Sequence, residues 1–221
     1  MRALVLCSSP RRNGNSAALA DAAARGLVAA GHEVRLLFAD DFLKGLLRDC
    51  RICRRADGEC SIEDGFRAAF MDEFLPAEGF IAATPVYWYG MSAQLKTFFD
   101  RMFCYIAASH PLSGEVMPRM MGKRLGLLLT SEETFPGVGA GIVHQIQEYA
   151  RYTGSDFAGV VHGYGNARGD IAFDPGNPLA KAEEFGRSFF SRHSSDYRID
   201  TPRPGVSGPG VISRRPTGTW T

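Results

Sequence analysis

Three of the chain's five cysteines, Cys50, Cys53 and Cys60, lie within eleven residues of one another. Cysteines at this density are typical of zinc knuckles, iron–sulfur sites and reactive thiols. The C-x2-C-x6-C spacing supplies three thiolates, whereas a cluster held by cysteine alone needs four. Three interpretations therefore stand: cysteines that pack or cap a loop, a zinc site completed by a distant ligand, or a thiol with a redox role.

A second polar segment, "CSSPRRNGNSAAL" (residues 7–19), follows the first apolar run and precedes a stretch rich in helix formers. A helix start offers unpaired N–H groups and the positive end of the helix dipole, so the segment predicts a phosphate site to which Arg11 or Arg12 adds charge. The alternative is an ordinary loop with Asn15 as the helix N-cap. The segment has neither a Walker loop nor a G-x-G-x-x-G, which argues against ATP and against a dinucleotide held in Rossmann fashion.

A third segment, "TPVYWYGMSAQLKTFFDR" (residues 84–101), carries three consecutive aromatic residues and a glycine before a helix that Ser92 is expected to cap. Three adjacent aromatic side chains on an irregular loop cannot all point into a core. Phosphate at one loop and aromatic residues at the other suit a flat ring that carries a phosphate tail.

These segments lie between strand-like and helix-like stretches that alternate along the chain. Two runs are almost wholly apolar, as in strands covered on both faces, and two are mixed, as in strands at a sheet edge. Apolar residues at helical spacing predict helices around Phe70, Phe98, Ile146 and Phe185. The five expected strands occupy residues 2–7, 32–38, 78–88, 123–130 and 155–165.

Five strands joined by helices predict an α/β fold, a flavodoxin-like three-layer sandwich with a five-stranded parallel sheet of order 2-1-3-4-5. This order places the two mixed strands at the edges, whereas the Rossmann order 3-2-1-4-5 would leave an apolar strand there. The expected domain covers residues 1–195, and the Pro- and Gly-rich segment 196–221 reads as an extended tail.

The chain's charge is almost balanced, with 25 Lys and Arg against 24 Asp and Glu. A balanced charge argues against nucleic acid and anionic lipid as partners. The chain shows no signal peptide and no apolar run near the ~20 residues of a membrane span. We expect a cytoplasmic protein whose cysteines are free thiols.

The same segments resemble those of a known family. "SSPRRNGNSAAL" and "TPVYWYGMSAQLKTFFDR", together with "GKRLGLLLTSEE" and "GYGNARGDI", are similar to the flavodoxin-like NAD(P)H-dependent FMN reductase and iron–sulfur flavoprotein family. The resemblance implies FMN as cofactor and NADH or NADPH as co-substrate, with no catalytic side chain and no metal ligand assigned. The implied FMN-binding residues are Ser9, Arg11, Asn15, Ser16 and Ala17 at the phosphate, Pro85, Val86, Tyr87, Trp88, Tyr89 and Gly90 along the ring, and Thr130, Ser131 and Glu132 on its other side.

By this resemblance the chain is an FMN-dependent oxidoreductase that passes hydride or electrons from a nicotinamide to a quinone, an aromatic compound or free flavin. The alternative is an electron carrier that serves protein partners, which the balanced charge disfavours because flavodoxin-type carriers tend to be acidic. We expect a homodimer or homotetramer.

Related iron–sulfur flavoproteins carry four cysteines in the region of Cys50, and Ala56 stands where the third would fall. Asp100 and Arg101 belong to the family motif but, at the far end of a helix, are expected to hold structure. Cys104 is expected about 20 Å from the cysteine-rich loop (residues 49–65), at about 1.5 Å per residue along that helix. The sequence therefore favours a relic of a cluster site.

Overall fold

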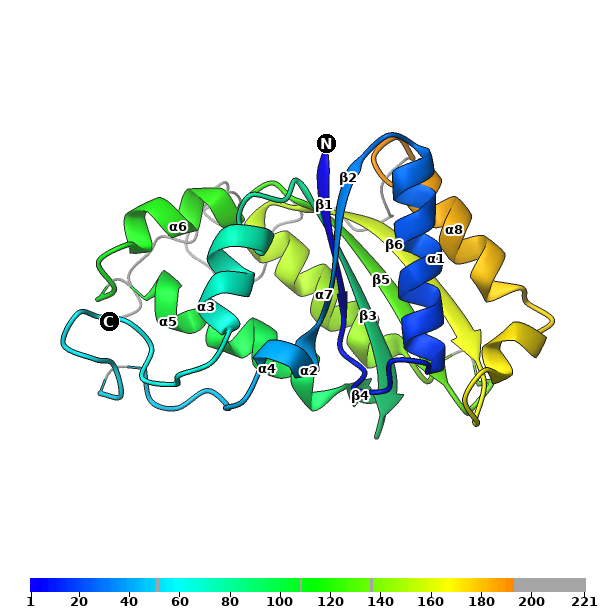
Figure 1. Cartoon of the computed structure of the whole chain (residues 1–221), viewed down its shortest axis with the longest axis horizontal. Coiled ribbons are helices and arrows are strands. Elements are labelled where there is room, and N and C mark those ends of the chain that lie inside the picture. Colours follow the sequence, from blue (N-terminus) through cyan, green and yellow to red (C-terminus); the bar gives the residue numbers. More distant parts are fainter. Residues whose placement is uncertain (51, 108, 136, 193–221) are drawn as a thin grey trace, which may run out of the picture.

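A computed structural model of the chain describes residues 1–50, 52–107, 109–135 and 137–192. An open sheet with helices on both faces forms the body of the molecule (Figure 1). Its strands are β1 (Arg2–Cys7), β2 (Glu33–Phe38), β3 (Gly79–Tyr87), β4 (Gly90–Met91), β5 (Arg124–Ser131) and β6 (Asp156–Tyr164). The helices are α1 (Asn15–Ala29), α2 (Ala39–Phe42), α3 (Phe66–Ala68), the π-helix η1 (Ala69–Phe74), α4 (Ala93–Arg101), α5 (Phe103–Ile106), α6 (Ser113–Met120), α7 (Ala140–Thr153), the 3₁₀-helix η2 (Asp170–Phe173) and α8 (Pro178–Ser188).

The five long strands run parallel in the order β2-β1-β3-β5-β6, which is the predicted order 2-1-3-4-5. The two mixed strands, β2 and β6, form the edges as expected. The sheet has one more strand than predicted, because the two-residue β4 folds back antiparallel on the end of β3. The predicted fold class is therefore confirmed, and the extra strand belongs to the aromatic loop.

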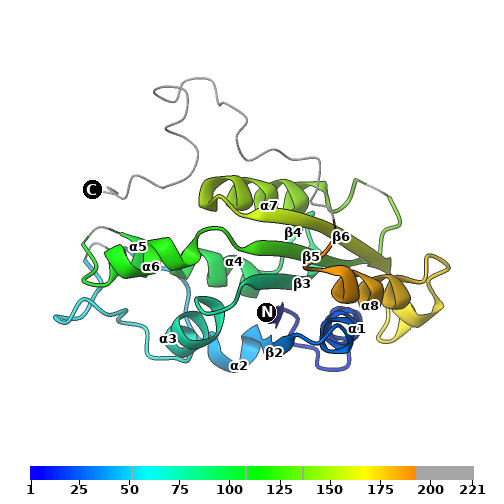
Figure 2. The same ribbon diagram turned by 90° about the horizontal axis from the view of Figure 1, so that it is seen from above.

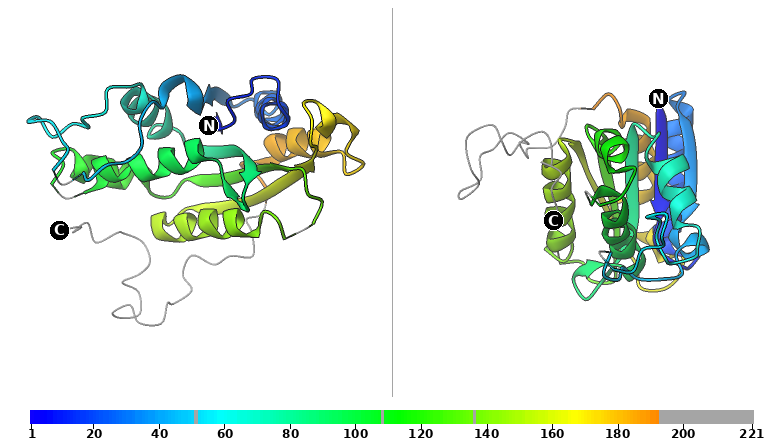
Figure 3. Two further views of the ribbon diagram at one scale, coloured as in Figure 1. Left: turned by 90° about the horizontal axis from the view of Figure 1, so that it is seen from below. Right: turned by 90° about the vertical axis from the view of Figure 1, so that its left-hand side faces the viewer.

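Each face of the sheet is covered by its own helices and its own hydrophobic core. Helices α1 and α8 lie on one face, and α4 and α7 lie on the other (Figures 2 and 3). Strands β1, β3 and β5 contribute alternate side chains to both cores, so their near-continuous apolar sequence is explained by burial on both faces. The sandwich has the three predicted layers.

The phenylalanine stripe predicted around Phe70 forms α3 and η1, which together cover residues 66–74. Phe66, Phe70 and Phe74 are fully buried, and successive rings stack with centroids 5.7 Å and 5.6 Å apart. Phe98 from α4 meets two of these rings edge-on, at 5.6 Å from Phe66 and 5.7 Å from Phe74. These aromatic contacts pack the continuous helix formed by α3 and η1 against α4.

The family-motif residue Arg101 holds structure, as predicted from the sequence. Its side chain is 2% exposed and forms a bidentate ion pair with Asp64 in the loop before α3. Burial alone would raise the pKa of Asp64, but Arg101 and the N–H groups of Lys44 and Phe66 hold it below its ordinary value. Arg101 thereby anchors the cysteine-rich loop to α4.

The prediction that Cys104 lies far from the cysteine-rich loop is wrong. Cys50 and Cys104 are both buried in the same hydrophobic core. The loop after β2 extends alongside α4 and α5, and Arg54 fixes it there by donating to the Cys104 carbonyl at 2.6 Å and to the Ser109 hydroxyl at 2.7 Å. Cys104 therefore lies against the cysteine-rich loop within one chain.

In the part of the chain that the structure describes, no helix combines the length and apolar character needed to cross a membrane. The predicted tail, residues 196–221, lies outside the described residues.

Candidate functional site

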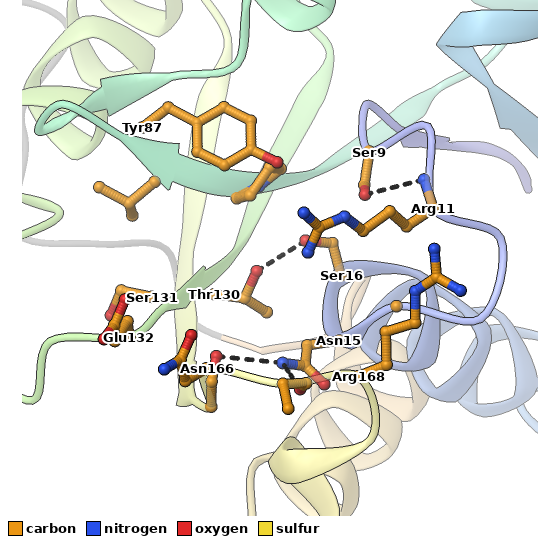
Figure 4. A pocket seen from close by; sticks show the side chains of 15 residues that line it. Ser9, Arg11, Asn15, Ser16, Tyr87, Thr130, Ser131, Glu132, Asn166 and Arg168 are labelled. Carbon is orange, nitrogen blue, oxygen red and sulfur yellow. Dashed lines mark hydrogen bonds between the residues drawn. The ribbon is translucent and has the colours of Figure 1, made fainter.

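A cavity of about 260 Å³ opens at the carboxyl ends of the strands, among the loops that follow β1, β3, β5 and β6 (Figure 4). Strands β1 and β3 are neighbours, and the chain leaves them toward opposite faces of the sheet. Open parallel sheets bind ligands at such a switch point. The cavity is therefore the candidate functional site.

Buried hydroxyl groups tie the loops after β1 and β3 to each other. Ser92 Oγ donates to Ser8 Oγ at 2.8 Å and accepts from the Leu95 N–H, which makes Ser92 the predicted N-cap of α4. The Ser92 N–H donates to Thr84 Oγ1 at 3.0 Å. These bonds fix the separation of the two loops that form the cavity's upper wall.

The predicted phosphate loop lies along one end of the cavity and ends at the start of α1. The N-cap is Gly14, so the expectation that Asn15 caps the helix is wrong; Asn15 is the first helical residue. The first turn of α1 carries no acidic residue, and its N–H groups have no intrahelical acceptor. Ser9 accepts the Arg11 N–H at 3.2 Å, and the Ser16 and Thr130 hydroxyls lie 2.6 Å apart.

The loop after β6 forms the opposite wall at this end, and the sequence-based list of site residues does not contain it. Asn15 holds it through both ends of its amide: Nδ2 donates to the Gly165 and Ala167 carbonyls at 3.1 Å and 3.0 Å, and Oδ1 accepts the Gly169 N–H at 3.0 Å. A Cβ on Gly165 would lie 2.9 Å from Asn15 Nδ2, so this close approach requires glycine. The signal in the sequence was the string "GYGNARGDI".

Two guanidinium groups approach the start of α1 from different loops. Arg11 comes from the loop after β1 and Arg168 from the loop after β6, and both line the cavity (Figure 4). Arg12, the other predicted candidate, points elsewhere: it forms an ion pair with Asp41 and lies over the Phe38 ring at 3.9 Å. The cavity thus combines free N–H groups with two positive side chains, which is the donor set that a phosphate needs.

The aromatic segment forms a tight β3–β4 hairpin at the other end of the cavity. Tyr87 pairs with Gly90, and both turn residues between them have positive φ angles, 49° at Trp88 and 61° at Tyr89. Positive φ at both central positions is the type I′ arrangement, which usually selects Asn or Gly. The sequence predicted that the three aromatic side chains cannot all point into the core, and in the structure none does: Tyr87, Trp88 and Tyr89 are 46%, 96% and 57% exposed.

The end of β5 supplies the floor of the cavity. Ser131 Oγ donates to the Glu133 carbonyl at 2.7 Å and lies 2.7 Å from His162 Nε2 on β6. With this geometry His162 donates its Nε2–H to Ser131, and burial lowers the pKa of His162. His162 thus supports a residue of the site, a contact that no local sequence pattern indicates.

The structure brings most of the predicted site residues to one cavity. Trp88 and Tyr89 instead line an adjoining cavity of about 180 Å³ that shares Val86, Ser131 and Glu132 with the first. Ala17 and Gly90 line neither cavity. The predicted residues that line the first cavity are Ser9, Arg11, Asn15, Ser16, Pro85, Val86, Tyr87, Thr130, Ser131 and Glu132, and those that the sequence missed are Gly14, Gly165, Asn166, Ala167 and Arg168.

This donor set fits FMN. One end of the cavity offers a phosphate two guanidinium groups and the start of α1. The other end offers a flat ring backbone groups and an aromatic side chain. Elsewhere, the five cysteines are free thiols, and the described residues contain no group of three or more His, Cys, Asp or Glu arranged to hold a metal ion.

The sheet order and the cavity at its switch point define a flavodoxin-like protein. The solved structure of an NAD(P)H:quinone oxidoreductase from Methanothermobacter marburgensis has the same fold, with a TM-score of 0.63 and 18% identity, over 87% of this chain and 98% of that one.

Residues 1–149 match the family of NADPH-dependent FMN reductases, and the chain belongs to that family. An iron–sulfur flavoprotein from Archaeoglobus fulgidus is 29% identical over 209 residues, which is 90% of this chain and 84% of that protein. A putative NAD(P)H-dependent FMN-containing oxidoreductase, YwqN, from Bacillus subtilis is 25% identical over 174 residues, which is 79% of this chain and 91% of that protein. The expected FMN-dependent NAD(P)H oxidoreductase is therefore confirmed at the level of the family.

Proposed function

We propose that the chain binds FMN in the cavity between the start of α1 and the β3–β4 hairpin. The N–H groups of the first turn of α1, together with Arg11 and Arg168, hold the phosphate. Residues 85–90 and 130–132 flank the ring on two sides, as the exposed aromatic hairpin and the β5 floor support. The Asn15 side chain positions the loop after β6, which carries Arg168. Only the backbone N–H of Asn15 is therefore available to the phosphate.

FMN held by these residues would supply the hydride and electron transfer between a nicotinamide and the next substrate, so the protein would need no side-chain nucleophile or base. The chain's own residues bind and orient the two partners. The cavity beside Trp88 and Tyr89 adjoins the first at Val86, Ser131 and Glu132 and gives a planar substrate an aromatic surface. We assign this adjoining cavity to the nicotinamide and, after its departure, to a small acceptor such as a quinone, an aromatic compound or free flavin.

One observation carries the proposal: a single cavity joins the anion-binding start of α1 to an exposed aromatic hairpin at the switch point of the sheet. The experiment is anaerobic stopped-flow mixing of the FMN-loaded protein with NADH and, separately, NADPH, followed by reoxidation with benzoquinone. We expect bleaching of the oxidised-flavin absorbance by at least one nicotinamide and its recovery on addition of the quinone.

Two results would contradict the proposal. Purified protein that neither contains nor binds FMN would rule out FMN as the cofactor. A bound flavin that neither nicotinamide reduces would leave the alternative of an electron carrier reduced by a protein partner.

We further propose that the protein acts in the cytoplasm as a homodimer or homotetramer. The five free thiols support a reducing compartment. The oligomeric state is checked by light scattering of the full chain.

A further inference from the structure

The adjoining cavity beside the β3–β4 hairpin has walls of two kinds. Trp88 and Tyr89 contribute exposed aromatic rings, and Glu132 and Glu133 contribute exposed carboxylates. The other described residues that line it carry no charge: Val86, Ser131 and Val138. The described lining of this cavity therefore contains two anions and no cation.

A hydrogen bond from Tyr89 connects the two kinds of wall. Tyr89 lies in the turn of the hairpin, and its hydroxyl donates to Glu133 Oε1 at 3.1 Å in the loop after β5. Among the residues that the structure describes, neither Glu132 nor Glu133 forms an ion pair with a Lys, Arg or His side chain. Their negative charge is thus not balanced by a described neighbour, and it acts on a molecule that enters the cavity.

The two cavities differ in charge. Of the described residues that line the first, Arg11 and Arg168 are positive and Glu132 is negative. Figure 4 shows Glu132 at the end of the first cavity that lies away from both arginines. Positive charge is therefore gathered at the proposed phosphate end, and negative charge is gathered where the two cavities meet.

Both kinds of wall act in the same direction on a planar ligand. Carboxylates attract positive charge and repel negative charge, and the face of an aromatic ring also attracts cations. An anionic ring would bring like charges together on entering the cavity. The oxidised nicotinamide ring is a planar cation, so the charge of the cavity suits the role that we assign to it.

From these observations we propose that the adjoining cavity selects planar electron acceptors that are neutral or positively charged, and rejects those whose ring carries a sulfonate or a carboxylate. This inference rests on the proposed function and names the class of acceptor. The acceptor gains two electrons and a proton from reduced FMN, which returns to its oxidised form, and a quinone takes its second proton from water.

Reoxidation of the flavin tests the charge preference without the nicotinamide step. The FMN-loaded protein is photoreduced without oxygen and mixed in a stopped-flow instrument with methylene blue (a cation), 1,4-benzoquinone (neutral) or 1,2-naphthoquinone-4-sulfonate (an anion). Each second-order rate constant for Glu132→Gln and for Glu133→Gln is divided by that of the wild type. Because each ratio compares one acceptor with itself, differences in reduction potential between the acceptors cancel.

In both variants the ratio should fall about three-fold for methylene blue, stay near one for benzoquinone and rise about three-fold for the sulfonate. This is the effect expected of one exposed charge pair. Added salt should weaken both effects in the wild type. Glu115→Gln is the matched control, because Glu115 is an exposed glutamate on α6 that lines neither cavity. It should leave all three ratios near one.

A binding measurement on the flavin-free protein gives a second readout. Trp220→Phe leaves Trp88 as the one tryptophan of the chain. Its fluorescence is quenched with 1-methylnicotinamide, a planar cation, and with nicotinate, an anion of the same ring. Glu132→Gln and Glu133→Gln, each made in this background, should lower the Stern–Volmer constant for the cation and raise that for the anion.

Equal ratios for the three acceptors in both glutamate variants would overturn the charge preference, and so would quenching constants that neither variant changes. A flavin that neither nicotinamide reduces would contradict the proposed function alone, because photoreduction bypasses that step. Protein that binds no FMN would also contradict the proposed function, and the quenching of Trp88 would still decide whether the cavity prefers cations.

Discussion

At the scale of single residues, the two neighbouring arginines of the phosphate loop have different roles. Arg11 lines the cavity, and Arg12 is engaged by Asp41 outside it. The sequence left this choice open because adjacent residues in a loop share the same local pattern. Only the course of the loop decides which guanidinium meets the start of α1.

Arg11→Ala should weaken FMN binding by roughly 10-fold or more, because a charge-assisted contact to the phosphate is lost. Riboflavin, which has no phosphate, should bind the variant and the wild type alike. Fluorescence titration with both flavins measures the difference, and Arg12→Ala is the matched control. Equal losses for FMN and riboflavin would show that Arg11 acts on the fold and not on the phosphate.

The hairpin residue Trp88 has an unfavourable backbone conformation and an almost fully exposed aromatic side chain. Its φ angle of 49° is unfavourable for a bulky side chain, while Asn adopts this region readily. Trp88→Asn should therefore raise the free energy of unfolding by about 0.5–1 kcal/mol and raise the KM for the nicotinamide several-fold. Urea unfolding and steady-state kinetics test the two effects.

Trp88→Phe is the control for the hairpin, since it keeps an aromatic ring and the strained backbone. It should leave the urea midpoint unchanged. A lower midpoint for Trp88→Asn than for the wild type would contradict the assignment of strain.

At the scale of elements, one side chain connects the start of α1 to the loop after β6. Both ends of the Asn15 amide are used by that loop, which carries Arg168. The sequence identified Asn15 as a member of the site, but the structure gives it a positioning role. The reason is that its bonding partners lie about 150 residues later in the chain.

Asn15→Ala should release the loop after β6 and weaken FMN binding, with faster amide exchange confined to residues 165–171. Hydrogen–deuterium exchange of the FMN-free protein detects the release without any flavin present. The exposed loop residue Asn13, changed to Ala, serves as the control and should leave the exchange unchanged. Unaltered exchange in Asn15→Ala would refute the positioning role.

At the scale of the whole molecule, a buried lysine links stability to pH. Lys123, 4% exposed directly before β5, donates to the Leu75 and Ala77 carbonyls at 2.9 Å and 2.5 Å and has the Phe74 ring 5.1 Å away. Burial, aided by Arg119, lowers its pKa from 10.5 to about 8. Between these values the unfolded chain binds more protons than the folded one, so the free energy of unfolding increases with pH.

The contribution of Lys123 to the free energy of unfolding should grow by about 2 kcal/mol between pH 7.5 and 9.5. Other groups titrate in the same range, so the measurement is the difference between the wild type and Lys123→Met. Guanidinium unfolding at both pH values gives this difference. A constant difference across the range would show that Lys123 keeps its ordinary pKa in the folded protein.

Local sequence patterns were sufficient to predict the order of the strands, the two covered faces and a ligand site at the loops after β1 and β3, whereas the individual cavity residues were implied by the family resemblance. Apolar runs mark strands buried on both faces, mixed runs mark edges, and polar or aromatic residues directly after a strand must lie at the carboxyl edge. Ser92 as an N-cap and the exposed aromatic residues were predictable for the same reason.

The meeting of distant segments, in contrast, could be seen only in the folded chain. The loop after β6 became a wall of the cavity through Asn15, His162 came to support Ser131, and Cys104 was joined to the cysteine-rich loop through Arg54. None of these contacts has a local signature, because each joins groups from different loops or strands through a few specific hydrogen bonds. Strand and helix patterns determine the sheet and the helices that cover it. The packing of long loops against them determines which side chains share a site.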